Sequence, residues 1–176
     1  MSAHEAAGKS DEWYTPPEVF EAIGLRFDLD VASPGSDVVP WVPADAHLTE
    51  FSLLLTWVGR IWMNPPFGKR NGYAPWADRF VAHGNGIALA PDRTSAPWFQ
   101  DFAQKVDGLL FWSPKIKFIK PDGTRGESPG TGTTLLSMGA ECTEALARLH
   151  GVNGIFCTPG RVMTHPTLKN KQGVYC

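Results

Sequence analysis

The sequence predicts a single α/β domain with a mostly parallel sheet and an antiparallel hairpin near its C-terminal end. Its 176 residues match the usual size of one domain, and 43% of them are hydrophobic, enough to form a buried core. Short apolar runs alternate with helical patterns through the middle of the chain, which favours parallel strands joined by helices. Residues 1–10 are typical of a flexible tail, so the domain is expected over residues 11–176.

The first helix is expected just after a threonine and two prolines. Thr15 can cap this helix, Pro16 suits its first position, and Glu18 stands three residues after the cap. Gly24 can end the helix in a left-handed conformation. Residues 27–31 then alternate apolar and acidic side chains, a period of two that predicts a strand.

The remaining elements follow from the same two periodicities. Helices are predicted over residues 47–57, 74–81, 96–105 and 141–150. Strands are predicted over residues 60–63, 86–90, 108–112 and 154–157. Residues 115–119 alternate lysine with apolar side chains, and residues 133–138 are also strand-like. A Gly/Pro-rich stretch separates the two, so together they predict a long hairpin with an extended tip.

Composition excludes several classes of protein. The formal net charge is −2, which argues against a strongly basic nucleic-acid coat but allows a local basic patch. No apolar run approaches the ~20 residues of a membrane span, and no signal peptide is expected. The three cysteines lack C-x-x-C spacing and the five histidines are scattered, so neither a disulfide framework nor a metal site is expected. We therefore expect a cytoplasmic protein.

The most informative motif is the run Asn64-Pro65-Pro66-Phe67, which follows a short apolar strand. Ligands of α/β sheets bind beyond the carboxyl ends of the strands. The Asn64 amide and the Pro65 carbonyl offer two acceptors, and Phe67 offers a flat apolar face. Together they suit an exocyclic amino group on an aromatic ring. The alternative interpretation is a proline-stiffened turn that packs one aromatic side chain.

This run is similar to the catalytic loop of amino-methyltransferases that use S-adenosylmethionine, and most of all to that of DNA adenine-N6 methyltransferases. Residues 11–18 resemble the Thr-Pro segment of these enzymes, which helps to form the methyl-donor pocket. Residues 27–33 resemble their first strand and its acidic end. With Trp57 and Gly59, the set most resembles the small phage-type DNA N-6-adenine methyltransferases. The resemblance implies a Rossmann-like methyltransferase fold.

The resemblance also implies roles for particular residues. The catalytic set is Asn64, Pro65, Pro66 and Phe67. The set expected to bind S-adenosylmethionine is Trp13, Tyr14, Thr15, Pro16, Asp28, Asp30, Ala32 and Asn64. Asp30 is the better placed of the acids, with Asp28 and Asp45 as alternatives. Thr15 could instead act only as a helix cap, and Trp13 could only pack.

The implied reaction is direct methyl transfer to N6 of an adenine that is flipped out of a duplex or single-stranded. The expected partner is adenine-containing DNA, and no membrane is involved. A phage-encoded enzyme would work in the host bacterial cytoplasm. Six cationic side chains and one aromatic side chain are expected to bind the DNA substrate. They are Lys69, Arg70, Tyr73, Arg93, Lys115, Lys117 and Arg125. The oligomeric state is left open.

Two alternatives remain at this point. The same chemistry could act on RNA adenine or on protein glutamine, because those enzymes use similar loops. The chain could also be a catalytically silent nucleic-acid-binding relative that keeps only the fold.

Overall fold

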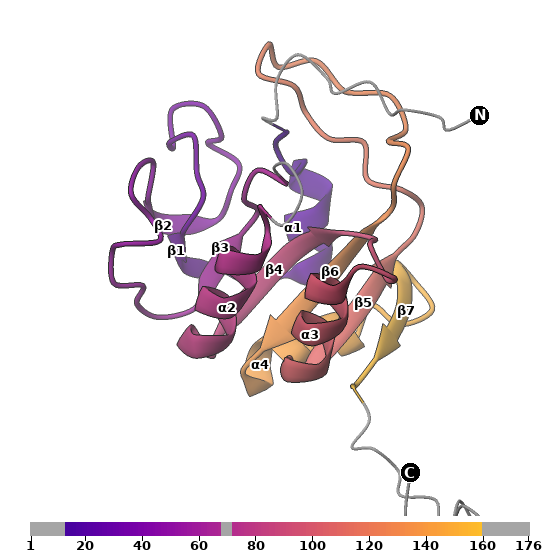
Figure 1. Cartoon of the computed structure of the whole chain (residues 1–176). Helices are drawn as coiled ribbons and strands as arrows, with labels where there is room; N and C mark the ends of the chain where they lie inside the picture. Colours follow the sequence, from indigo (N-terminus) through magenta and orange to yellow (C-terminus); the bar gives the residue numbers. More distant parts are fainter. Residues whose placement is uncertain (1–12, 68–71, 160–176) are drawn as a thin grey trace, which may run out of the picture.

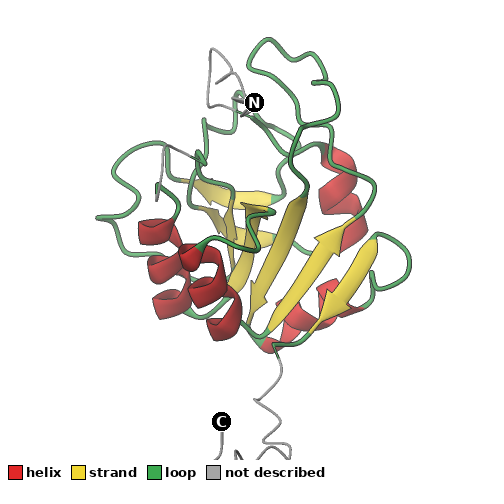
Figure 2. Cartoon of the chain, turned by 45° about the vertical axis from the view of Figure 1, so that its right-hand side comes forward, coloured by secondary structure: helices red, strands yellow, loops and turns green. Residues whose placement is uncertain are grey.

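The computed structural model describes residues 13–67 and 72–159. Within these residues a seven-stranded sheet lies between two pairs of helices (Figures 1 and 2). Helices α1 (Pro17–Ile23) and α4 (Ala140–Ala147) cover one face, and α2 (Ala74–His83) and α3 (Pro97–Lys105) cover the other. The α/β class agrees with the sequence-based expectation.

The sheet has the strand order β2-β1-β3-β4-β6-β5-β7. Three pairings are parallel and join β1 (Phe27–Asp30), β2 (Ala44–His47), β3 (Ile61–Met63) and β4 (Gly86–Pro91). The other three are antiparallel and involve β5 (Gly108–Trp112), β6 (Thr133–Met138) and β7 (Gly154–Cys157).

The prediction of a mostly parallel sheet is therefore wrong. The antiparallel strand β6 inserts between β4 and β5, so it replaces one parallel contact with two long antiparallel ones. Because β5 still runs in the direction of β4, the connection that leaves β5 emerges at the same edge of the sheet as those that leave β1 and β3.

The hairpin predicted between residues 115–119 and residues 133–138 does not form. Strand β6 pairs with β5, whereas residues 115–119 lie in the long connection between these two strands. Within that connection Ile119 forms isolated bridges with Tyr14 and with Arg125. The alternating pattern of residues 115–119 thus marks a segment that is buried on one side, at Ile116 and Phe118, without joining the sheet.

Two local expectations are corrected at the amino-terminal half. Pro16, and not Thr15, occupies the N-cap position of α1, and no side chain caps this helix. Strand β2 ends at His47, and residues 48–57 form turns and irregular backbone in place of the helix predicted over residues 47–57. The turns are closed by the Trp57 indole N–H, which donates to the Ser52 carbonyl oxygen at 3.0 Å.

The core has two parts, one on each face of the sheet. Phe20 of α1 and Leu146 of α4 pack with Trp62 on one face. Phe80 of α2 and Phe102 of α3 pack on the other face with a T-shaped ring contact at 5.7 Å. Because helices cover both faces of the described sheet, the central strands β3 and β4 are buried along their whole length, and a ligand can approach them at the strand ends.

Candidate active site

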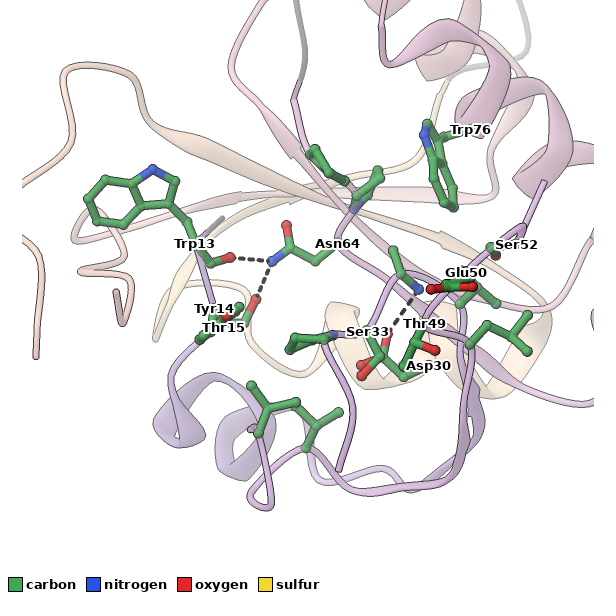
Figure 3. A pocket seen from close by; sticks show the side chains of 18 of the residues that line it. Trp13, Tyr14, Thr15, Asp30, Ser33, Thr49, Glu50, Ser52, Asn64 and Trp76 are labelled. Atoms are coloured by element: carbon green, nitrogen blue, oxygen red, sulfur yellow. Dashed lines mark hydrogen bonds between the residues drawn. The ribbon is translucent and has the colours of Figure 1, made fainter. Parts of the chain in front are cut away.

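One cavity of about 350 Å³ lies beyond the carboxyl ends of β1, β2 and β3 (Figure 3). The chain passes from β1 to β2 on one side and then to β3 on the other, so the strand order reverses between β1 and β3. Open α/β sheets bind ligands at such a switch point because the connections diverge there and leave a crevice. The volume lies within the range of small-molecule sites.

Asp30 closes the end of β1 and lines the cavity. Its side chain is buried, and Oδ1 accepts a hydrogen bond from the Ala32 backbone N–H at 3.2 Å. On β2, Nδ1 of His47 lies 3.7 Å from Asp30 Oδ2 and 2.9 Å from Ser33 Oγ. This interaction with the Asp30 carboxylate raises the pKa of His47 above its ordinary value.

The Asn64–Phe67 run follows β3 and forms the opposite wall of the cavity. The Asn64 side-chain nitrogen donates to the Trp13 carbonyl oxygen at 3.1 Å and to Thr15 Oγ1 at 3.2 Å (Figure 3). Phe67 is half-buried, and its ring centroid lies 6.4 Å from that of Tyr73. The two prolines prevent this loop from forming a regular helix or strand.

The amino-terminal segment before α1 forms a third wall. Trp13, Tyr14 and Thr15 line the cavity, as does Ala32 after β1. Pro16 is buried at the start of α1 and does not reach the lining. The connection between β5 and β6 holds this segment in place, because Tyr14 and Ile119 of that connection exchange two backbone hydrogen bonds of 2.9 Å.

Several residues that line the cavity were not predicted from the sequence. They include Ser33, Thr49, Glu50, Phe51, Ser52 and Trp76. Glu50 and Phe51 lie in the connection that leaves β2, where a helix was expected, so their strand-end position was hidden. Strand β2 (Ala44–His47) was not predicted from the sequence, and recognising it would have identified Glu50 as a second acid close to a strand terminus, beside Asp30.

Two of the acids considered for the donor lie outside the cavity. Asp28 is exposed near the start of β1, and its Oδ2 accepts a 2.6 Å hydrogen bond from the Arg60 backbone N–H. Asp45 is exposed on β2 and forms an ion pair with Arg26. Both carboxylates are thus engaged in linking strand starts and neighbouring loops.

The residues assigned to the substrate are spread over several locations. Tyr73 is fully buried and donates to the Leu89 carbonyl oxygen at 2.8 Å, and burial raises the pKa of its hydroxyl. The Tyr73 ring packs against that of Phe67 and does not line the cavity. Arg93 is exposed after β4. Lys69 and Arg70 lie outside the described residues.

The other three cations belong to the β5–β6 connection. Lys115 donates to the carbonyl oxygens of Pro129 and Gly130, at 3.1 and 3.0 Å. Lys117 is exposed. Arg125 forms a two-contact ion pair with Glu18 of α1, which lowers the pKa of Glu18. The connection therefore carries positive charge and is also fastened to α1.

The described ranges contain neither a cluster of metal ligands nor a helix that could span a membrane. No three His, Cys, Asp or Glu side chains come together there as metal ligands would. None of the helices in those ranges has the length and hydrophobicity to cross a bilayer.

An α/β sheet with a cavity at its switch point, walled by a strand-end acid and an Asn-Pro-Pro-Phe loop, has the architecture of an amino-methyltransferase. The family model described as DNA N-6-adenine-methyltransferase (Dam) matches residues 2–154 of the chain. The match covers most of the 176 residues, so the chain belongs to this family and is a DNA adenine methyltransferase. No curated protein and no solved structure gave a significant match.

Proposed function

We propose that this enzyme transfers a methyl group from S-adenosylmethionine directly to N6 of an adenine, with both molecules bound in the cavity described above. The observation that supports this proposal is that Asp30 and Asn64, at the ends of two adjacent strands, line the same cavity. One wall can then hold the donor while the other holds the acceptor. That the substrate is an adenine in DNA follows from membership of the family.

The residues on the β1 and β2 side fit the chemistry of the donor. S-adenosylmethionine carries a sulfonium, an amino group and ribose hydroxyls, and bound here it would supply an electrophilic methyl carbon. Asp30 and Glu50 offer carboxylates to its cationic and hydroxyl groups, since hydrogen bonds to charged acceptors are the strong ones. Trp13 and Phe51 offer aromatic faces to its adenine.

The residues on the β3 side suit the target base. The Asn64 side-chain oxygen and the Pro65 carbonyl would each accept a hydrogen from the exocyclic amino group, while Phe67 packs against the ring. An adenine within a duplex cannot reach these groups, so the base must be flipped out or taken from a single strand. Stacking on an aromatic side chain offsets part of the cost of leaving the helical stack.

These residues act by position and electrostatics. Two acceptors on the amino hydrogens aim the N6 lone pair away from themselves and toward the donor side of the cavity. Fixed acceptors would also stabilise the positive charge that develops on N6 as the bond between the methyl carbon and the sulfonium sulfur breaks, and loss of one N6 proton to water would give the neutral methylated base. Holding both reactants in one cavity removes the entropy cost of their encounter. No covalent intermediate on the protein is required.

The test is transfer of a labelled methyl group from S-adenosylmethionine to DNA, RNA and total protein in parallel, with the modified base identified by mass spectrometry. Label in N6-methyladenine of DNA is the expected result. Label in RNA adenine or in protein glutamine would replace the proposed substrate with one of those alternatives. No label, together with no binding heat for the donor, would identify a catalytically silent relative.

A further inference from the structure

The orientation of the Asn64 amide is set by groups far away in the sequence. The side-chain nitrogen faces the Trp13 carbonyl oxygen and Thr15 Oγ1, at 3.1 and 3.2 Å. Figure 3 shows the amide oxygen turned away from both of them. A carbonyl oxygen can only accept a hydrogen bond, so the nitrogen, and not the oxygen, must face Trp13.

This orientation has a consequence for the substrate. If the amide turned over, its oxygen would oppose the Trp13 carbonyl oxygen, and two hydrogen-bond acceptors in contact repel each other. Asn64 therefore presents an acceptor to the cavity, which matches a hydrogen-donating amino group and rejects an exocyclic carbonyl oxygen at the same position. An amide without such partners could present either end.

The segment that supplies these two acceptors is itself held on both sides. Tyr14 pairs with Ile119 through two backbone hydrogen bonds, between the two residues that contact Asn64. The Trp13 ring lies over Gly126, where a β-carbon would come within 2.7 Å of its Cζ3 atom. Thr15 itself is buried. The β5–β6 connection thus keeps Trp13 and Thr15 in place opposite Asn64.

We propose that the Trp13 carbonyl and the Thr15 hydroxyl are positioning groups that hold the Asn64 amide with its oxygen toward the target amino group. This inference rests on the proposed function and adds to it the origin of the selectivity for an amino group. Thr15 then acts through Asn64 and not through the methyl donor. Removal of its hydroxyl should affect turnover, and donor binding should stay close to that of the wild type.

The matched variants are Thr15→Val, which keeps the shape and removes the hydroxyl, and Thr15→Ser, which keeps the hydroxyl. Loss of one hydrogen bond that orients Asn64 should lower the kcat of Thr15→Val about tenfold. Thr15→Ser should restore kcat to within about twofold of the wild type, and the donor KM should change little in either variant. A raised donor KM with normal kcat in Thr15→Val would overturn the proposal, since Thr15 would then contact the donor.

Asn64→Asp tests the Trp13 contact, which no side-chain substitution can remove. At neutral pH the carboxylate of this variant would set an oxygen against the Trp13 carbonyl, and kcat should fall about a hundredfold. A protonated carboxyl can donate to that carbonyl as the amide does. The ratio of variant to wild-type kcat should therefore rise between about pH 8 and about pH 5, because carboxyls protonate toward acid pH. A ratio that does not change with pH would contradict the proposal.

A third measurement needs neither donor nor DNA, so it separates this inference from the proposed function. In nitrogen-15 NMR spectra of the free protein, the Asn64 side-chain N–H pair should exchange slowly with water in the wild type and in Thr15→Ser. It should exchange faster in Thr15→Val. Equal exchange in all three proteins would overturn the positioning role, whereas absent methyl transfer by the wild type would overturn only the proposed function.

Discussion

His47 and Asp30 stand side by side as register partners on β2 and β1, with His47 Nδ1 3.7 Å from Asp30 Oδ2. The Asp30 carboxylate favours the protonated imidazole and raises the pKa of His47. A group whose pKa is higher in the folded state stabilises the fold at pH values below its unfolded pKa of 6.5. That contribution is lost as pH rises through the raised value.

We therefore expect His47→Gln to lower the free energy of unfolding at acid pH and to have a smaller effect above neutrality. Glutamine keeps a polar group for Ser33 while it removes the titratable ring. The measurement is urea unfolding of both proteins between about pH 5 and about pH 8, the interval that brackets an ordinary histidine. A difference that is constant across this interval would show that the Asp30 contact has no effect on stability.

Asp30 should bind the methyl donor, and Asp28 provides the matched control on the same strand. A lost charge-assisted hydrogen bond is worth ~1.5–3 kcal/mol, so Asp30→Asn should weaken S-adenosylmethionine binding about tenfold or more. Asp28→Asn should leave this affinity unchanged, because Asp28 lies outside the cavity and accepts from the Arg60 N–H. Titration calorimetry of both variants decides the point. Equal affinities in the two would transfer the donor contact to another group, with Glu50 the next to test.

Gly59 should tolerate no side chain, for two separable reasons. Its φ of +67° is left-handed, and a β-carbon there would overlap the Asp28 carboxylate. Gly24 has almost the same φ, +68°, with nothing near its missing β-carbon. Gly24→Ala should thus cost only the backbone strain, about 1–2 kcal/mol. Gly59→Ala should cost a further 1–3 kcal/mol or so from overpacking.

Thermal and urea unfolding of the two glycine variants give this comparison directly. If Gly59→Ala were no more destabilising than Gly24→Ala, the strand β1 would have room to move Asp28 aside. In that case Gly59 would be required only for its backbone conformation.

The sequence predicted the parts of the site that depend on short-range pattern. Asn64 was placed at a strand end because an apolar run precedes it and two prolines forbid its continuation. The alternation of apolar and acidic residues over residues 27–31 makes Asp30 the better candidate for the donor contact, and of Asp28 and Asp30 only Asp30 lines the cavity. Both inferences needed no knowledge of distant contacts.

The features that depend on distant contacts were not predictable. Strand β6 pairs with β5, about 25 residues earlier, and with β4, still earlier in the chain. Residues 115–119 show the same alternation of side chains but do not enter the sheet. The partners of the Asn64 amide lie 49 and 51 residues before it in the chain. A helical pattern over residues 47–57 was overridden because Trp57 folds back to bond Ser52, which leaves Phe51 and Leu54 exposed.

Asn64→Ala should remove most of the methyl transfer and leave part of the donor binding. Loss of one preorganised contact to the reacting group typically lowers the rate about 10²–10³-fold. Donor affinity is measured on the same preparation by calorimetry, so that a folding defect is recognised. Near-normal kcat in a folded Asn64→Ala protein would mean that the Asn-Pro-Pro-Phe loop does not hold the target amino group.

The DNA-binding surface can be located by salt dependence, because each phosphate that a cation neutralises releases counterions. The slope of log affinity against log salt concentration is about −0.9 per phosphate on duplex DNA and about −0.7 on single strands. Lys117 is exposed on the β5–β6 connection, so Lys117→Ala should flatten the slope by about one unit. Arg125 is already paired with Glu18, so Arg125→Ala should flatten it less.

Phe67→Ala should weaken DNA binding in a different way and serves as the contrast. Its ring offers a stacking surface worth ~1–3 kcal/mol per base, which carries no charge. This variant should therefore lower affinity and turnover while the salt slope stays at the wild-type value. Lys115→Ala should flatten the salt slope more than Phe67→Ala and less than Lys117→Ala. The reason is that the Lys115 ammonium also donates hydrogen bonds to the Pro129 and Gly130 carbonyl oxygens of the same connection. If neither lysine variant changes the slope, phosphate must be bound elsewhere on the chain, and Arg93 after β4 is the next cation to substitute.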